Sequence, residues 1–151
     1  MSLIHSEATA VIKASPDEIY NILADYDERH RAILPPQFFT ELAVVEGGQG
    51  AGTVIQVAMS VMGAKRDYRF IVSEPEPKRQ LVEIDEAVGV TTSFNIEPLN
   101  DSRYSRVTIS TAARPSPGFL GAMEKWLNPM ITRHIYRKTL DRLAEYAGSH
   151  Q

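Results

Sequence analysis

A chain of 151 residues is long enough for one domain with a buried core and leaves little room for a second. Its 16 Lys and Arg against 19 Asp and Glu give a net charge of -3, which lacks the basic excess that binding to DNA or RNA usually demands. The chain has no cysteine, which excludes disulfides, thiolate nucleophiles and cysteine-ligated zinc. No long apolar run is present, so we expect a cytoplasmic protein without integral membrane segments.

The N-terminal residues 4–13 alternate loosely between apolar and polar types, and a helix signal follows them. Ser15 can cap the helix, Pro16 suits its first position and Glu18 completes a capping box. Apolar residues then recur at three- and four-residue spacing, which predicts one buried helix face made of Ile19, Ile22, Leu23 and Tyr26. The pair "PP" at 35–36 ends this helical region, because proline cannot continue a helix.

After that break the apolar period changes to two and stays so until about residue 113. Six short segments are rich in β-branched and aromatic residues and are separated by turn formers; they span 40–46, 53–62, 67–74, 79–86, 88–99 and 104–113. Six strands in sequence with short turns predict hairpins and an antiparallel sheet.

The glycine-rich stretch "GGQGAG" lies between the first two of these segments and has the composition of a phosphate-binding loop. Such a loop needs a helix after it and usually a lysine on the phosphate, because helix amides hold the anion. A strand pattern follows here, and no lysine occurs until Lys65. We therefore predict a hairpin turn. No cofactor fingerprint and no cluster of metal ligands occurs elsewhere, so neither a cofactor nor a metal is expected.

The last third of the sequence predicts a long helix that starts near Ser116 and Pro117. Its first apolar stripe, at about 100° per residue, consists of Leu120, Met123, Trp126, Leu127, Met130 and Ile131. Pro129 interrupts the helix and is expected to kink it. Beyond the kink the apolar face moves to Ile135, Tyr136, Leu140, Leu143 and Tyr146, so the two halves should pack against different surfaces.

Four segments resemble the START-like SRPBCC superfamily, particularly its polyketide cyclase/dehydrase and lipid-transport branch: "IKASPDEIYNILADY", "EGGQGAGTVIQV", "FNIEPLNDSRYSRVTIS" and "LNPMITRHIYRKTLDRLAEYA". Together they cover nearly the whole chain. The resemblance implies one α+β domain over 1–151 with a helix-grip fold, in which a curved seven-stranded antiparallel sheet wraps a long C-terminal helix around a cavity. It also implies that apolar or amphipathic small molecules bind there, and that only a subset of members are enzymes, without a shared catalytic triad.

Strand alternation assigns the cavity walls, because residues i and i+2 share a sheet face. The predicted inward rows are Ile55, Val57, Met59 and Val61; Tyr68, Phe70 and Val72; Val82 and Ile84; Val90, Thr92, Phe94 and Ile96; and Val107, Ile109 and Thr111. They are expected to face a helix stripe of Met123, Trp126, Leu127, Met130 and His134. The same pattern also fits an ordinary packed core.

Polar residues within these rows are informative, because a buried polar group is costly without a partner. His134 is expected to point at the sheet, as a satisfied core histidine, a ligand hydrogen-bonding group or a general acid or base. His134 and Tyr68 are the candidate catalytic residues. The candidate ligand-binding residues are Phe38, Phe39, Val57, Met59, Tyr68, Phe70, Thr92, Phe94, Trp126, Met130 and His134.

Three functions remain open from the sequence. The first is a carrier or binding module for a small hydrophobic ligand, over whose cavity the segment "ILPPQFF" at 33–39 would form part of a lid. The second is a cyclase, dehydratase or hydrolase in the same cavity, for which proton transfer needs two polar groups within hydrogen-bond reach. The third is a protein-interaction module. A homodimer is compatible with each of them.

Overall fold

The computed structural model describes residues 3–114 and 128–149. In chain order its elements are β1 (Ile4–Ile12), α1 (Pro16–Ala24), α2 (Arg29–Ile33), β2 (Phe39–Glu46), β3 (Val54–Val61), β4 (Ala64–Ser73), β5 (Gln80–Asp85), β6 (Val90–Leu99), β7 (Tyr104–Ala113) and α4 (Pro129–Ser149). The strands form one antiparallel seven-stranded sheet in the order β1-β7-β6-β5-β4-β3-β2. The predicted α+β helix-grip fold is confirmed.

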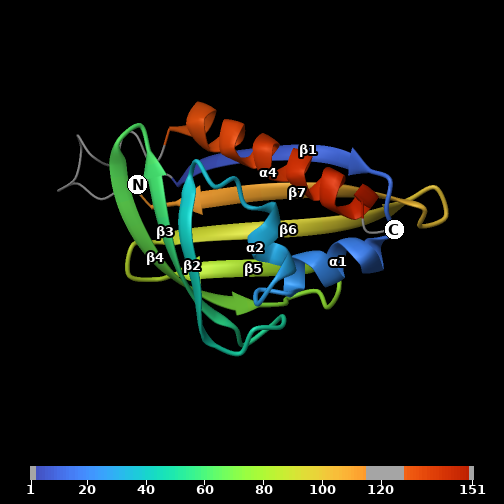
Figure 1. The fold of residues 1–151 in the computed structure, drawn as a ribbon, viewed down its shortest axis with the longest axis horizontal. Helices are drawn as coiled ribbons and strands as arrows, with labels where there is room; N and C mark the ends of the chain where they lie inside the picture. The colour runs from blue at the N-terminus through green and yellow to red at the C-terminus, as the bar shows by residue number, and fades with distance from the viewer. Residues whose placement is uncertain (1–2, 115–127, 150–151) are drawn as a thin grey trace.

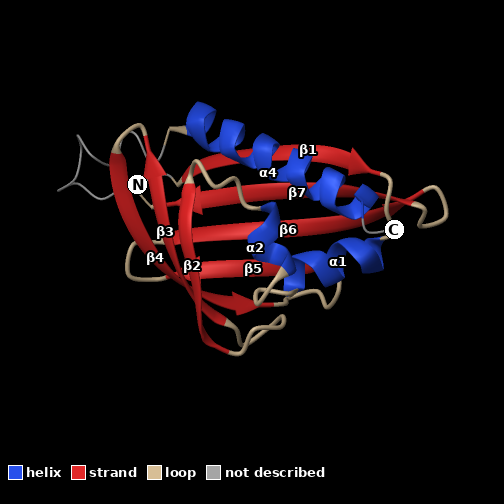
Figure 2. Ribbon diagram, in the orientation of Figure 1, coloured by secondary structure: helices blue, strands red, loops and turns tan. Residues whose placement is uncertain are grey.

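The sheet curves, and the three helices of the described residues, α1, α2 and α4, lie on one of its faces (Figures 1 and 2). Helix α4 runs along the part of the sheet formed by β1 and β7, whereas α1 and α2 lie in front of β5 and β6 (Figure 1). The part of the sheet formed by β2, β3 and β4 bends towards the N-terminal end of α4. The described helices therefore cover only one face of the sheet.

Helix α1 begins where the sequence predicts. The Ser15 side chain accepts a hydrogen bond from the backbone nitrogen of Glu18 at 3.2 Å, and Pro16 occupies the first turn. The predicted apolar face is buried, and Tyr26, just past the helix end, is fully buried with it. This packing fixes the corner between α1 and α2 against the sheet.

The glycine-rich stretch forms the hairpin between β2 and β3, as predicted. Its loop also contacts the end of α1, because the Tyr26 nitrogen donates to the Gly48 oxygen and the Gly50 nitrogen donates to the Ala24 oxygen, both at 2.8 Å. Gly48 has a φ of 143°, and a Cβ there would lie 2.3 Å from an Asp27 carboxylate oxygen. The glycines thus allow close contact between the hairpin and the α1–α2 corner.

Helix α4 differs from its prediction at its start. It begins at Pro129, where the Asn128 side chain accepts from the Met130 nitrogen at 2.9 Å, so this proline occupies a first-turn position. The expected kink within a continuous helix is therefore wrong. The proposed helix start at Ser116 and Pro117 lies outside the described residues.

The inward rows of β3, β4, β6 and β7 are as predicted, but the row of β5 is shifted by one residue. Leu81, Glu83 and Asp85 pair with Phe94, Thr92 and Val90 of β6, whose side chains face the interior. Paired residues of antiparallel strands share a face, so β5 presents Glu83 to the interior. Val82 and Ile84 occupy the opposite face. The prediction followed the apolar pair Val82 and Ile84, but the interior row combines the apolar Leu81 with the acidic Glu83 and Asp85.

Candidate ligand cavity

A cavity of about 90 Å³ lies between the concave face of the sheet and the helices. A single water needs roughly 10–15 Å³, so this space has room for a small organic molecule. Its walls come from α2, β2 to β7 and α4. They consist of His30, Leu34, Phe39, Leu42, Ile55, Val57, Met59, Val61, Tyr68, Phe70, Glu83, Val90, Thr92, Phe94, Ile109, Thr111, Ala113, Ile131, Thr132, Ile135, Tyr136 and Thr139.

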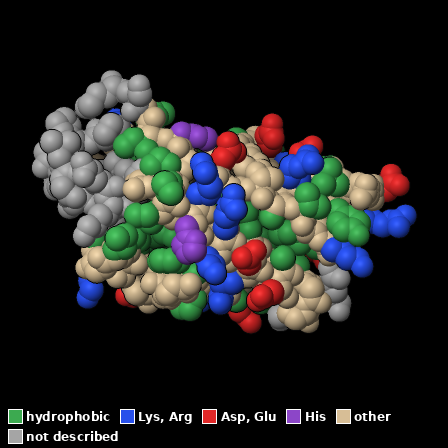
Figure 3. All heavy atoms as spheres, turned by 90° about the horizontal axis from the view of Figure 1, so that it is seen from above, with side chains coloured by type: hydrophobic (Ala, Val, Ile, Leu, Met, Phe, Trp, Pro, Cys, Tyr) green, Lys and Arg blue, Asp and Glu red, His purple; other side chains and the backbone are tan. Residues whose placement is uncertain are grey.

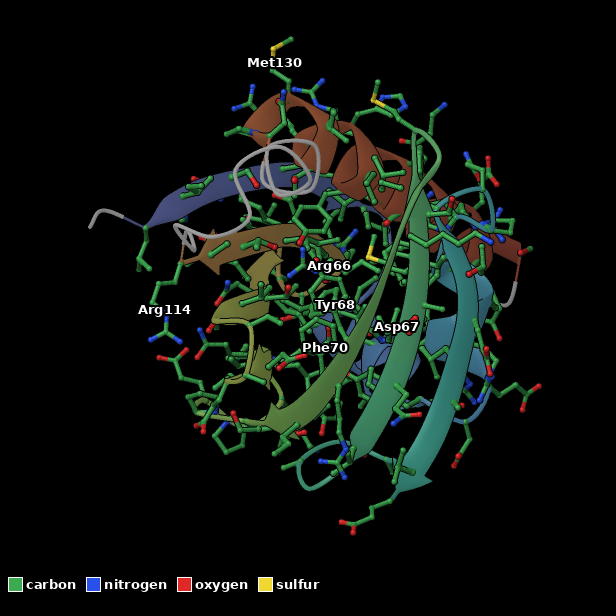
Figure 4. The ribbon with its side chains drawn as sticks, turned by 90° about the vertical axis from the view of Figure 1, so that its left-hand side faces the viewer. Arg66, Asp67, Tyr68, Phe70, Arg114 and Met130 are labelled. Carbon is green, nitrogen blue, oxygen red and sulfur yellow. The ribbon has the colours of Figure 1, made fainter. Side chains whose placement is uncertain are left out.

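Seven of the candidate ligand-binding residues line this cavity: Phe39, Val57, Met59, Tyr68, Phe70, Thr92 and Phe94. Figure 4 shows Tyr68 and Phe70 on β4 pointing into the interior, and their rings are stacked with centroids 5.3 Å apart. Burial raises the pKa of Tyr68, so its hydroxyl remains neutral. The structure thus brings together the sheet half of the predicted site.

Two residues of the helix half of the predicted site, Met130 and His134, do not line the cavity. Met130 is 77% exposed and points away from the sheet (Figure 4), and His134 is exposed as well. The inward-facing imidazole predicted for His134 is therefore wrong. The phase of α4 is set by its second apolar face, which puts Ile135 and Tyr136 inward instead. Trp126, with Met123 and Leu127 of the same predicted stripe, lies outside the described residues.

The exposed face of α4 is polar, and lysine and arginine side chains are interspersed with acidic ones when it is seen from above (Figure 3). His134 belongs to this side of the helix but touches Phe38, with ring centroids 6.0 Å apart in an edge arrangement. Phe38 is half-buried and does not line the cavity, whereas its neighbour Phe39 does. The segment after Pro36 therefore contacts the exposed side of α4 through Phe38 and the cavity through Phe39.

Sequence reasoning missed a buried polar cluster formed by Tyr26, His30 and Glu83. The Tyr26 hydroxyl donates to Glu83 Oε2 at 2.7 Å, and His30 Nε2 lies 3.7 Å from the same oxygen. The Tyr26 and His30 rings are stacked 4.3 Å apart, and the Phe94 ring meets His30 edge-on at 5.4 Å. Of the three residues, His30 and Glu83 line the cavity.

Two local features position His30. The Asp25 carboxylate, four residues before α2, accepts hydrogen bonds from the Glu28 and Arg29 nitrogens, at 3.2 and 3.4 Å. His30 Nδ1 lies 2.7 Å from the Leu23 carbonyl oxygen. A carbonyl oxygen only accepts, so Nδ1 carries the proton and Nε2 of the neutral ring is the acceptor. The imidazole thus presents its basic nitrogen on the side of Glu83.

Burial moves the pKa values of this pair in opposite directions. Burial lowers the pKa of His30 to about 4, although its bond to Leu23 and the charge of Asp25 act in the other direction. Burial raises the pKa of Glu83 to about 7, against the hydrogen bond from Tyr26. A charged form is costly in an apolar surrounding, so both groups favour neutrality. Between these pH values the pair consists of a neutral imidazole and a carboxylic acid.

A second polar group lies on the opposite wall. The Tyr136 hydroxyl of α4 is hydrogen-bonded to Thr111 Oγ1, and Thr92 Oγ1 is 3.3 Å from the same threonine oxygen. Burial raises the pKa of Tyr136 above its ordinary value, and the nearby Glu83 carboxylate adds to the effect. The walls of the cavity are therefore mainly apolar and contain two polar clusters. The first holds the Glu83 carboxyl and the His30 imidazole, and the second consists of the hydroxyls of Tyr136, Thr111 and Thr92.

Within residues 3–114 and 128–149, no group of three or more His, Asp or Glu side chains is arranged to hold a metal ion. In the same part of the chain, no helix is long and apolar enough to span a bilayer.

Comparison with known proteins gives a family and a set of similar folds. The family model described as polyketide cyclase / dehydrase and lipid transport matches residues 4–148. No curated protein matches the chain. Among solved structures, the KanY protein is 25% identical with a TM-score of 0.83, and the match covers 98% of this chain and 99% of that one.

Two more distant structures share the fold. The Zhui aromatase/cyclase from Streptomyces sp. R1128 is 18% identical with a TM-score of 0.74, over 97% of this chain and 94% of that one. A START superfamily protein from Mycobacterium smegmatis is 15% identical with a TM-score of 0.71, over 97% and 99%. The chain therefore belongs to the polyketide cyclase / dehydrase and lipid transport family.

Proposed function

We propose that the protein binds a small hydrophobic or amphipathic molecule in the cavity between the sheet and α4. The observation that carries the proposal is the cavity itself, about 90 Å³ with mainly aliphatic and aromatic walls. Protein interiors usually pack with few voids larger than a water molecule. An apolar space with a few convergent polar groups is typical of a small-molecule site.

The family supports the same chemistry. Its description joins polyketide cyclases and dehydrases with lipid transport, and a cavity with mainly apolar walls suits a lipid-like ligand. The two polar clusters of the cavity would then orient a ligand that has an oxygen-bearing end. Such a ligand gains affinity from burial of its apolar surface, at roughly 25 cal/mol per Å².

The test is a fluorescence titration with 1-anilinonaphthalene-8-sulfonate, an amphipathic probe. Val57 is buried and lines the cavity, so Val57→Phe adds a ring to the cavity wall. Its neighbour Gln56 is exposed on the other face of β3, so Gln56→Phe adds the same ring outside. We expect Val57→Phe to weaken the probe about 10-fold or more and Gln56→Phe to leave it unchanged. Equal affinity in all three proteins would contradict binding in the cavity.

Native mass spectrometry of the purified protein complements the titration. A co-purified small molecule that is retained by the wild type and by Gln56→Phe, but not by Val57→Phe, would identify the ligand class directly.

A second candidate function is catalysis on such a ligand. The specific observation in its favour is the buried pair of His30 and Glu83, because binding alone does not require a carboxyl group and an imidazole in an apolar wall.

A further inference from the structure

The pair formed by His30 and Glu83 has three properties that ordinary core residues do not combine. Both side chains are almost fully buried, at 2% and 6% exposure. Both line the cavity rather than the solid core. They also lie 3.7 Å apart without the short hydrogen bond that would satisfy each through the other.

The surrounding contacts fix what each group presents. The bond from Nδ1 to Leu23 leaves the lone pair of His30 Nε2 as a base. Tyr26 donates to one oxygen of Glu83, which holds the carboxyl in place. An acid and a base thus lie side by side in one wall, at a separation that suits two atoms of one small molecule that are joined through a third.

We propose that this pair is an acid–base site for proton transfer on a ketone or related carbonyl compound that has a hydrogen on the adjacent carbon. The proposal rests on the proposed function, because the substrate must first bind in the cavity. The reaction class is keto–enol tautomerisation, with the exchange of the adjacent-carbon hydrogens that accompanies it.

The step balances without any further reactant. His30 Nε2 removes a proton from the carbon next to the carbonyl, and the C–H electron pair forms the C=C bond. The carbonyl π electrons move to its oxygen, which takes the proton of the Glu83 carboxyl. The enol is then bound beside an imidazolium and a carboxylate. Return of the proton from Nε2 to the carboxylate across the 3.7 Å separation restores the pair.

The pair is in its active form when the imidazole is neutral and the carboxyl is protonated. With pKa values of about 4 for His30 and about 7 for Glu83, this form dominates between those pH values. Other ionisable groups that act on the pair are Tyr26 and Asp25 at the α1–α2 corner and Tyr136 on α4. Burial raises the pKa of both tyrosines, so they stay neutral across this range.

The experiment uses 2-indanone, an apolar ketone of two fused rings, in deuterated buffer. Loss of the signal of its hydrogens next to the carbonyl is followed by proton NMR, and binding is measured by saturation transfer in the same samples. We expect the protein to accelerate exchange beyond a mixture of free imidazole and acetic acid at equal concentration. Glu83→Gln and His30→Asn should lower the protein-catalysed rate about 100-fold. The asparagine amide retains a donor near the Leu23 oxygen.

Matched controls change the same residue types outside the cavity. Glu97 and His5 are exposed strand residues, so Glu97→Gln and His5→Asn should exchange at the wild-type rate. The wild-type rate should form a plateau between about pH 4 and 7 and fall on both sides. Tyr26→Phe removes the hydrogen bond that lowers the pKa of Glu83, so its upper limb should move to higher pH. The pH profile of Tyr26→Phe still tests the role of Glu83 if Glu83→Gln fails to fold.

The outcomes separate this inference from the proposed function. Binding of 2-indanone with no exchange above the free imidazole mixture, or full exchange in folded Glu83→Gln, overturns the acid–base site and leaves ligand binding intact. Failure to bind 2-indanone while anilinonaphthalene sulfonate still binds overturns the ketone assignment. Failure of both compounds to bind overturns the proposed function as well.

Discussion

Strands β3 and β5 both contribute to the walls of the cavity, but the side chains that they contribute differ in polarity. The inner row of β3 is apolar, and Ile55 and Val57 are buried there. The inner row of β5 places Glu83 among apolar neighbours and directs Ile84 away from them. Burial of a carboxyl group opposes folding unless partners compensate it. The difference indicates that β3 serves stability and shape, whereas β5 carries the polar chemistry of the cavity.

The largest expected effect on stability comes from placing a carboxylate, such as the one that β5 carries, in the inner row of β3. Val57→Asp puts a carboxylate in a buried apolar row that has no Tyr26 or His30 beside it, so we expect a loss of about 3–5 kcal/mol in the free energy of unfolding. Urea denaturation measures it. Gln56→Asp, on the exposed face of the same strand, should lie within about 0.5 kcal/mol of the wild type. Similar losses in the two variants would show that β3 has no apolar inner face.

The second effect concerns the dependence of stability on pH. The folded-state pKa of Glu83 is about 7, against an ordinary 4.5. The folded state therefore holds an extra proton between these values, and the stability that this confers is complete below pH 4.5 and is lost as the pH rises through 7. Glu83→Gln lacks this loss. Its unfolding free energy relative to wild type should rise by an amount on the order of 3 kcal/mol across that range.

Urea denaturation at several pH values checks the second effect. His30 contributes a slope of opposite sign, because its folded pKa of about 4 lies below the ordinary 6.5, but this contribution is present in both proteins. A difference between Glu83→Gln and wild type that stays constant from pH 4.5 to 7 would mean that Glu83 is ionised in the fold throughout.

The third effect tests how much the hydrogen bond from Tyr26 to the buried Glu83 carboxyl contributes to stability. Tyr26→Phe removes the donor to a buried carboxyl group, so we expect a loss of about 1–3 kcal/mol in the free energy of unfolding. Tyr20 makes the same type of bond to Glu74, but this pair is only half-buried. Water can replace the lost donor there, so Tyr20→Phe should cost less, as thermal denaturation of both variants will show. A larger loss in Tyr20→Phe than in Tyr26→Phe would contradict the stabilising role that we assign to the buried hydrogen bond between Tyr26 and Glu83.

The fourth effect concerns the lid proposed for 33–39. Phe39 lines the cavity and Phe38 contacts α4 through His134, so their joint replacement by serine should weaken anilinonaphthalene sulfonate about 10-fold. The fold should persist, because both side chains are only half-buried. Circular dichroism beside the titration checks both statements, and unchanged affinity would count against a lid.

The smallest effect is expected at His134. Its ring is exposed, and only its edge contact with Phe38 ties it to the segment before β2. His134→Phe keeps a flat ring for that contact and should change stability by less than about 0.5 kcal/mol, with probe affinity unchanged. Calorimetry and the same titration suffice. A clear loss of affinity would restore the residue to the binding site.

The fold was predictable because its signals are local and repeated. The cap at Ser15, the strand period and the glycine turn each depend on neighbours in sequence, and the structure confirms them. The position of His134 was not predictable from an apolar stripe that included residues before Pro129, because α4 begins only at that proline.

The polar cluster was missed for a different reason. In "RQLVEIDE" the hydrophobic row of Val82 and Ile84 gives the wrong face, and a shift of one residue exchanges every side chain between the two faces. Only tertiary pairing with β6 places Glu83 inside. His30 gave no periodic signal, since it lies in a helix of 5 residues. A usable hint was that polar residues occur on both faces of this strand, with Gln80 on one and Glu83 and Asp85 on the other, so hydrophobicity alone did not identify the inner face.

The most direct test of the cavity as the binding site is the location of bound 2-indanone by intermolecular nuclear Overhauser effects to methyl groups. We predict contacts to Val57, Ile109 and Ile135, which line the cavity from β3, β7 and α4. We predict none to the exposed methyl groups of Val11, Val45 and Ile71, which are 58%, 46% and 51% exposed. Contacts to this exposed set without contacts to the cavity set would contradict the assignment of the site.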